Sequence, residues 1–158
     1  MLAGMPTAPV LEYEFTLSAT LGPQQVVGPG PYGMRIVVPV VGGTVQGPRL
    51  NGEVVSSGAD WLLIGNDGFG RVDVRAQFVT DDGATVYAYY EGVLELNEAA
   101  VTASGTPGAE SSFEDQYFRT SPRFESGAKQ YAWLHQSTFV GKGRMSGDGV
   151  EYEVYRVC

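Results

Sequence analysis

The sequence has few of the residues that build most metal sites and many catalytic centres. It holds one cysteine, Cys158, and one histidine, His135, among 158 residues. A single thiol cannot form an internal disulfide, and no CxxC pair is present to hold zinc. A metal site would depend on carboxylates, but neighbours such as Asp81-Asp82 and Glu114-Asp115 point to opposite faces of a strand. We therefore expect no metal and no cofactor.

Basic residues are also scarce. Lys and Arg number 10 against 18 Asp and Glu, which gives a net charge of −8. Nucleic-acid binding depends on clustered basic residues that neutralise phosphates, and anionic membranes attract the same residues. We therefore expect neither partner. A small-molecule ligand is expected instead, and a homodimer stays open.

Long apolar runs are absent as well. No stretch approaches the ~18 apolar residues of a membrane-spanning helix. The first nine residues have neither the basic region nor the apolar core of a signal peptide. The sequence therefore predicts a cytoplasmic location.

Stretches long enough for helices are rare. With 22 Gly and 9 Pro, the longest segments free of both are 13 residues long, Ala109–Ser121 and Ala128–Val140. A typical helix needs ~11–12 residues, so at most two or three helices fit. Helix bundles, coiled coils and doubly wound α/β folds are excluded.

Short strands separated by glycine and proline are present throughout. Gly28–Gly33 is expected to interrupt regular structure and Gly42-Gly43 to turn the chain. Alternation of Tyr131, Trp133 and His135 with their neighbours favours a strand over a helix in the last long segment. The predicted strands are Leu11–Ser18, Met34–Val41, Thr44–Gln46, Glu53–Ser56, Ala59–Gly65, a hairpin within Arg71–Leu96, Glu98–Ser104, Tyr117–Thr120, Ala128–Val140 and Val150–Val157.

Strands of this number and spacing are typical of a sandwich or a closed barrel. Closure removes exposed sheet edges, so we predict an all-β fold, one antiparallel barrel of about 8–10 strands with little helix. Its general shape would be that of the calycins and lipocalins. Residues 1–158 form one domain in this interpretation, with residues 1–10 as a loose tail.

The hairpin within Arg71–Leu96 is the most specific local prediction. Thr80-Asp81-Asp82-Gly83 fits a type I turn whose glycine takes the left-handed position of a bulge. This turn places Thr80 opposite Ala84 and sorts the side chains into two faces. The apolar face pairs Phe78 with Val86, Ala76 with Ala88 and Val74 with Tyr90. The polar face pairs Gln77 with Tyr87, Arg75 with Tyr89 and Asp73 with Glu91.

Several motifs resemble the domain of unknown function 3237 family, also called uncharacterised protein family 0311. They are Val40–Pro48, Gly52, Ser57–Trp61, Asp67-Gly68, Val79–Tyr87, Tyr117–Pro122 and Tyr131–Leu134. The resemblance covers nearly the whole chain and implies a single compact β-barrel, but no function. The chain departs from the family pattern at His135, because the family is expected to carry an amide side chain after Trp-Leu.

The candidate site consists of polar and aromatic residues that a barrel lumen would bring together. Eight-stranded barrels are wide enough to hold one small ligand. Arg75 would hold an oxyanion while Asp60 or His135 moves a proton. The candidate catalytic residues are Asp60, Arg75, Tyr89 and His135, and the candidate substrate-binding residues are Trp61, Tyr87, Glu91, Tyr117, Arg119, Tyr131 and Trp133.

Each candidate also has a purely structural interpretation. Arg75, Tyr89 and Glu91 would equally suit the solvated exterior of a barrel. Asp60 would suit a turn or cap, Trp61 and Trp133 core packing, and His135 an exposed position. The sequence predicts a cofactor-independent isomerase, cyclase, dehydratase or lyase acting on a small oxygenated or aromatic metabolite. A lipocalin-like carrier and a structural or oligomerisation domain remain the alternatives.

Overall fold

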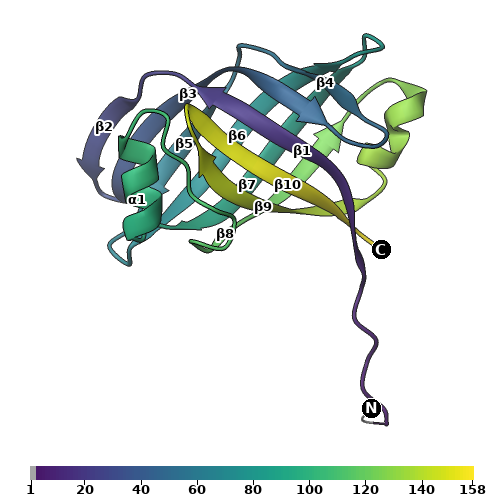
Figure 1. The fold of residues 1–158 in the computed structure, drawn as a ribbon, viewed down its shortest axis with the longest axis horizontal. Helices are drawn as coiled ribbons and strands as arrows, with labels where there is room; N and C mark the ends of the chain where they lie inside the picture. Colours follow the sequence, from purple (N-terminus) through teal and green to yellow (C-terminus); the bar gives the residue numbers. More distant parts are fainter. Residues whose placement is uncertain (1–2) are drawn as a thin grey trace.

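Strand pairing closes the sheet on itself in the computed structural model, which describes residues 3–158 (Figure 1). Its elements are β1 (Leu11–Leu21), β2 (Gln25–Gly30), β3 (Gly33–Gln46), β4 (Asn51–Val54), β5 (Ala59–Ile64), β6 (Phe69–Thr80), β7 (Thr85–Glu95), α1 (Glu98–Gly105), β8 (Phe118–Glu125), the 3-10 helix η1 (Lys129–Leu134), β9 (Thr138–Ser146) and β10 (Gly149–Val157). The described residues form a closed antiparallel barrel of eight strands, in which β4 and β5 share one place between β6 and β3. The predicted all-β barrel is confirmed.

The barrel closes where β1 pairs with β3, and this pairing requires glycine at Gly43. Gly43 lies opposite Ala19 and has a φ of 134°. A Cβ at this position would lie 1.9 Å from the carbonyl oxygen of Ser18. The predicted turn at Gly42-Gly43 is therefore wrong, because these glycines let β3 continue against β1.

The hairpin of β6 and β7 has the predicted register. Val74 pairs with Tyr90, Arg75 with Tyr89, and every other predicted pair is present. Gly83 has a φ of 88°, and the N–H of Thr80 donates to the carbonyl of Ala84 over 2.8 Å. The apolar face is buried, so it is the inner face of the barrel.

The predicted strand at Glu98–Ser104 is wrong, because this segment forms α1. The side chain of Asn97 caps the helix by accepting a hydrogen bond of 3.0 Å from the N–H of Ala100. Ala100 and Ala103 are the buried residues of this helix. Asparagine is a preferred N-cap, and alanine is the best helix former, so local preference favours the helix.

The predicted strand at Ala128–Val140 is also wrong over most of its length. Residues 129–134 form η1, and the strand β9 begins at Thr138. The hydroxyl of Tyr131 donates to Asp82 over 2.8 Å and holds η1 against the β6–β7 turn. Apolar residues two apart occur in a tight helical turn as well as in a strand, so alternation misled the prediction.

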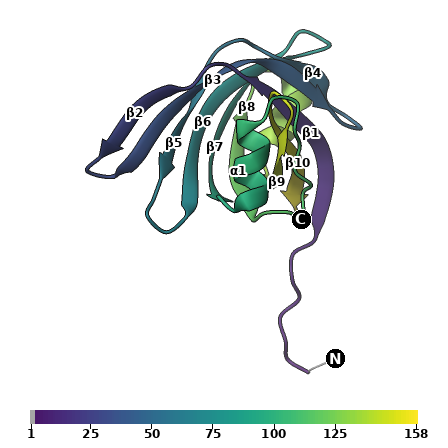
Figure 2. The same cartoon turned by 60° about the vertical axis from the view of Figure 1, so that its left-hand side comes forward.

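A strand also forms where none was predicted. β2 pairs with β3 through a register shift between Val26 and Gly28, and it continues through Pro29. The strand lies at the edge of the sheet, where a proline and a bulge are tolerated. β2 extends beside β3 away from the closed barrel (Figure 2).

Inward-facing side chains differ between the two ends of the barrel. At the end covered by η1, here called the η1 end, four phenylalanine rings pack edge to face with centroids 5.3–6.3 Å apart. They are Phe15, Phe78, Phe124 and Phe139. The opposite end, here called the α1 end, lies beside α1 (Figure 1). None of the helices within residues 3–158 has the length and hydropathy needed to span a bilayer.

Candidate functional site

The hairpin's polar face lies on the outside of the barrel. The guanidinium of Arg75 stacks on the ring of Tyr89 at 4.7 Å, and the hydroxyl of Tyr89 donates to Glu91 over 2.6 Å. Arg75 and Glu91 are exposed. The structure therefore agrees with the exterior interpretation of these three residues and does not place them in the lumen.

Asp60 lies on the inner face of the barrel. Its partners across the ladders are Val38 on β3 and Val74 on β6, both buried. Between β5 and β6 the pairing is interrupted after Asp60, and its carboxylate accepts a hydrogen bond of 2.9 Å from the N–H of Asp73. The carboxylate thus takes the place of a strand partner.

The pKa of Asp60 is raised from 3.8 to about 6. Burial is the largest cause, because it disfavours the charged form, and the negative charge of Asp73 adds to the rise. The Asp73 N–H and the charge of Arg35 act in the opposite direction and are outweighed. A carboxyl with this pKa exists in both protonation states near neutral pH.

Two tyrosines share the interior with Asp60. Tyr90 and Tyr152 are 5% and 4% exposed, their ring centroids are 5.1 Å apart, and each hydroxyl influences the pKa of the other. Burial is the first cause that raises the pKa of each hydroxyl, and the charge of Asp60 adds to both shifts. Both hydroxyls therefore stay protonated and remain hydrogen-bond donors at neutral pH.

A pocket of about 460 Å³ opens at the α1 end. It lies between α1, the end of β1 and the β9–β10 turn, and Val38 and Met145 contribute to its wall. Val38 is the direct ladder partner of Asp60. Val38, Ile36 and Met34 are the inward-facing residues of β3 toward its start. Val38 is buried, whereas Ile36 and Met34 are half-buried, so solvent exposure increases in this direction. Solvent thus approaches Asp60 from this end.

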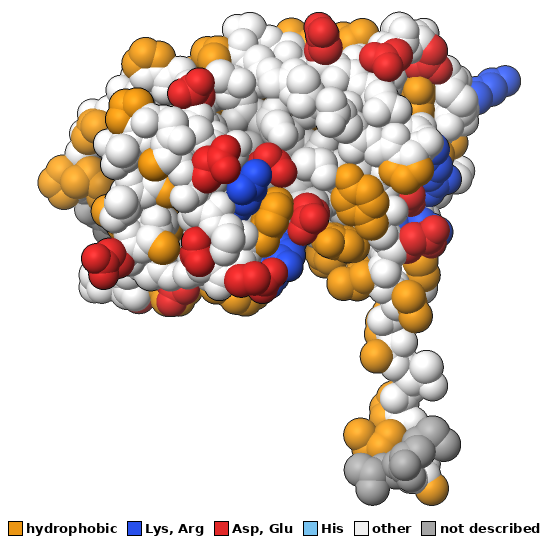
Figure 3. All heavy atoms as spheres, viewed as in Figure 1, with side chains coloured by type: hydrophobic (Ala, Val, Ile, Leu, Met, Phe, Trp, Pro, Cys, Tyr) orange, Lys and Arg blue, Asp and Glu red, His pale blue; other side chains and the backbone are white. Residues whose placement is uncertain are grey.

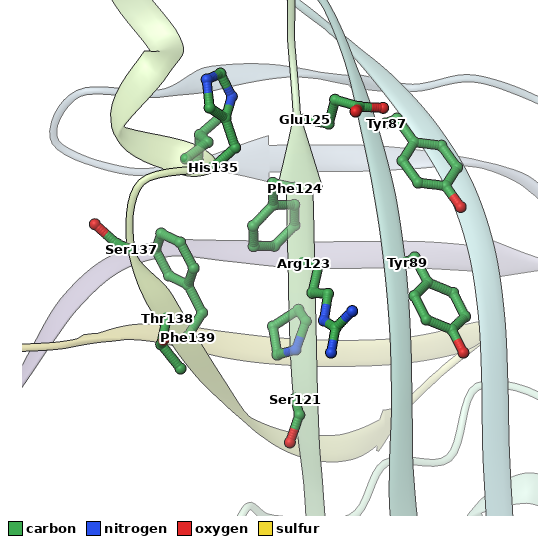
Figure 4. Close-up of a pocket in the computed structure, with 12 residues that line it drawn as sticks. Tyr87, Tyr89, Ser121, Arg123, Phe124, Glu125, His135, Ser137, Thr138 and Phe139 are labelled. Carbon is green, nitrogen blue, oxygen red and sulfur yellow. The ribbon is translucent and has the colours of Figure 1, made fainter.

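A second hollow, here called the β8–β9 cleft, lies on the barrel wall at the η1 end and has a volume of about 580 Å³. β8 and β9 pair only at Arg119–Lys142 and Thr120–Gly141, and beyond these pairs the strands separate. Figure 4 shows His135 on the η1 side of β8 and Tyr87 and Tyr89 on the β7 side. Three candidate site residues therefore line one cleft, but Asp60 is not among the residues that line it.

The remaining candidates are dispersed. Trp61 lies on the outer face, 38% exposed, where its carbonyl accepts a hydrogen bond of 2.7 Å from Arg35. Tyr117 and Arg119 stack on each other at 5.3 Å near the start of β8. Trp133 supports the guanidinium of Arg49 at 3.6 Å. None of these residues is brought to Asp60, and Tyr131 holds η1 in place.

Tyr90 and Tyr152 were missed as site residues by the sequence analysis. The sequence did contain one signal, because the predicted register already placed Tyr90 on the apolar face opposite Val74. A hydroxyl on an inner face needs a polar partner. That partner, Tyr152, lies on β10, and no local pattern in the sequence connects the two strands.

Asp60 and the tyrosine pair form a group that can transfer protons. A carboxyl with a pKa near the working pH can donate a proton and take one back. Neutral tyrosine hydroxyls can donate hydrogen bonds to an oxygen that gains negative charge. Among the residues that the structure describes, no group of three or more His, Cys, Asp or Glu is arranged to hold a metal ion.

Solved structures of similar chains share this fold. A conserved protein of unknown function from Rhodopseudomonas palustris, RPA1785, superimposes with a TM-score of 0.88 at 34% identity, covering 98% of this chain and all of the other. A β-barrel-like protein from Acinetobacter baumannii gives a TM-score of 0.83 at 29% identity, covering 98% and 99%.

One relative carries an enzyme name. The hydroalkoxylation enzyme phnH of Penicillium herquei is 31% identical over 140 residues, which cover 89% of this chain and 78% of phnH. RPA1785 carries the name UPF0311 protein and is 34% identical over 151 residues, covering 94% of this chain and 98% of its own length. The family described as protein of unknown function, DUF3237, matches residues 9–157. The resemblance seen in the sequence is thereby confirmed, and the chain belongs to this family.

Proposed function

We propose that the protein is a cofactor-independent enzyme that moves a proton with Asp60 inside the barrel. The observation that carries the proposal is the carboxyl on the inner face, with a pKa of about 6, beside two buried tyrosine hydroxyls. A strongly perturbed carboxyl next to a pocket is typical of a catalytic acid or base. The carboxyl reduces the stability of the barrel, so an apolar residue would suit a purely structural interior better.

The addition of an alcohol to an alkene is the reaction we propose, and the enzyme name of the Penicillium relative supports it. The Asp60 carboxyl gives its proton to one alkene carbon, and the alcohol oxygen bonds to the other. The proton of the alcohol then returns to the carboxylate. One C=C π bond and one O–H bond break while one C–H and one C–O bond form, so no oxidant or reductant is consumed.

The apolar inner face around Asp60 supports a neutral substrate. Ile36, Met34 and Leu62 on the inner face are apolar and half-buried. On the inner face, the hydroxyls that interact with Asp60 are the neutral ones of Tyr90 and Tyr152. An anionic substrate would face the Asp60 carboxylate without a compensating cation on this inner row.

The test uses 2-prenylphenol, a small neutral probe that carries an alcohol-type oxygen and an alkene within reach of each other. We expect the wild-type protein to cyclise it, and Asp60→Asn to lower turnover by ~10²–10⁴-fold. Asp81→Asn is the matched control, because Asp81 is an exposed turn residue, and its turnover should equal that of the wild type.

Three outcomes separate the candidate functions. Equal rates in wild type and Asp60→Asn would remove Asp60 from the mechanism. Binding of the probe by calorimetry with no conversion would favour the carrier alternative. Loss of turnover on prolonged dialysis against a chelator would contradict cofactor independence.

A further inference from the structure

The β8–β9 cleft exposes two strand edges that have no partner strand along the cleft within residues 3–158. β8 pairs with β7 along its whole length, and β9 pairs with β10 along its whole length. Between β8 and β9, only two residue pairs form, Arg119 with Lys142 and Thr120 with Gly141. Pro122 lies two residues beyond Thr120, and because it lacks an N–H it cannot continue the ladder as a donor. Two open edges therefore face each other across a cleft of about 580 Å³.

Extended chain is the natural occupant of such a cleft. Strand edges bind peptides by adding main-chain hydrogen bonds, with side-chain pockets supplying specificity. The floor consists of Phe124, Phe139 and Leu134, and the rim carries Arg123 and Glu125, which are opposite in charge. The site thus suits a short, uncharged and largely apolar strand. Five β8 residues, 121–125, give a length of about 17 Å.

This chain contains a segment of that kind. Residues 3–10, here called the arm, run away from the barrel (Figure 1), and each of them is exposed. A turn at residues 3–4 precedes the irregular chain of residues 5–10. The arm has no charged residue, although the protein carries a net charge of −8. Pro6 and Pro9 restrict it to extended backbone, which reduces the entropy lost on docking.

Apolar side chains of the arm and of the start of β1 are exposed to solvent. Met5, Val10, Leu11 and Tyr13 are 63%, 66%, 53% and 40% exposed. Figure 3 shows hydrophobic side chains along the arm and where it meets the barrel. An uncovered cluster of this kind on a small protein marks an interaction surface.

The arm is directed away from the cleft of its own chain. The N–H of Val10 donates to the carbonyl of Cys158, and the N–H of Cys158 donates to the carbonyl of Val10 over 2.7 Å. These bonds extend the β1–β10 ladder by one pair and aim the arm along the strand axis. Its own cleft lies to the side, because Leu11 pairs with Val157 and Val157 with Thr138 at the cleft rim.

We propose that the arm of one copy lies in the β8–β9 cleft of a second copy, which gives a homodimer by reciprocal arm exchange. The base of the arm and the rim of the cleft are two strands apart, about 10 Å. Two copies that face each other with this part of the barrel can therefore exchange both arms around one two-fold axis. Such an exchange gives a closed dimer rather than a longer polymer. The dimer is independent of the chemistry at Asp60.

The test is disulfide capture between two single-cysteine proteins in a Cys158→Ser background. One carries Ala8→Cys in the arm, and the other carries Ser137→Cys at the cleft rim. We expect a mixture of the two to form a cross-linked heterodimer, because docking raises the local concentration of the thiols. The control replaces Ser137→Cys by Thr102→Cys, an exposed position on α1 at the other end of the barrel.

Each outcome decides the proposal. Cross-linking about 10²-fold faster with Ser137→Cys than with Thr102→Cys supports it. Equal rates overturn it, as does a monomer mass by light scattering for the wild-type chain. A third measurement uses both Ala8→Cys and Ser137→Cys in one dilute chain. A monomer closed by a disulfide within one chain would show that the arm folds onto its own cleft, which also overturns the second copy as occupant.

Discussion

The two ends of the barrel interior are built for different purposes. The η1 end is filled by edge-to-face rings, and its side chains such as Phe78 and Phe139 are each 1% exposed. The α1 end holds a carboxyl, two hydroxyls and a half-exposed apolar row. Packed rings stabilise a fold, whereas a buried carboxyl destabilises it. The contrast indicates that stability is concentrated at one end so that the other end can carry a reactive group.

Truncating the packed end should give the largest change in stability. Phe78→Ala removes a ring that contacts both Phe15 and Phe124, and large-to-small changes of this kind cost about 3–5 kcal/mol. Urea denaturation measures the loss. A loss below about 1 kcal/mol would mean that the η1 end does not dominate the stability of the barrel.

Neutralising the carboxyl at the α1 end should stabilise the protein. The folded pKa of Asp60 is about 6 against an ordinary value of 3.8, so the folded state holds the proton more tightly. The stability from this group is present below about pH 4 and lost as the pH rises to about 6. Asp60→Asn avoids this loss, and it should raise the free energy of unfolding at pH 7 by up to about 3 kcal/mol.

The pH dependence of the stability difference between Asp60→Asn and the wild type serves as the control for this prediction. The advantage of Asp60→Asn should shrink toward zero as the pH falls from 6 to 4. Asp81→Asn, an exposed site, should show no such trend. A variant less stable than the wild type at pH 7 would contradict a destabilising carboxyl.

The tyrosine pair should act as one unit with a smaller effect. Tyr152→Phe leaves the rings in contact but removes the buried hydroxyl that interacts with Tyr90, at an expected cost of about 1 kcal/mol. Adding Tyr90→Phe should cost little more, because the partner hydroxyl is already lost. A double-mutant cycle measures the coupling, and full additivity would show that the two hydroxyls act independently.

The smallest effects are expected on the outer wall. Arg75→Ala should change stability by no more than about 0.5 kcal/mol, as for other surface residues. His135→Gln should leave turnover of the probe unchanged, since His135 lines the β8–β9 cleft, which Asp60 does not line. A large loss of turnover in His135→Gln would move the reaction site to the outside of the barrel.

The hairpin was predicted correctly because residues close together in the sequence determine its turn and register. Thr80 to Gly83 set the turn, the turn set the register, and the register sorted the faces. The helix α1 was missed although Asn97 and the following alanines carry a cap and high helix preference. Ala128–Val140 was mistaken for a strand because a six-residue 3-10 helix is shorter than the window in which periods can be distinguished.

The candidate site was predicted only in part, and the reason is topological. Asp60 was identified, but Arg75, Tyr89 and His135 were grouped with it although they lie on the outside. The sequence of a hairpin shows which side chains share a face, but it does not show which distant strands lie next to that face in the barrel. Tyr152 meets Tyr90 through closure of the sheet, and sequence patterns do not contain that contact.

The protonation state of Asp60 is the central claim, and a carboxyl titration by NMR measures it directly. Comparing the carboxyl carbon signals of the wild type with those of Asp60→Asn assigns the resonance. The structure predicts a midpoint of about 6. A midpoint near the ordinary 3.8 would show that the carboxyl is solvated and charged, and it would contradict its role as the proton-transferring group of the barrel interior.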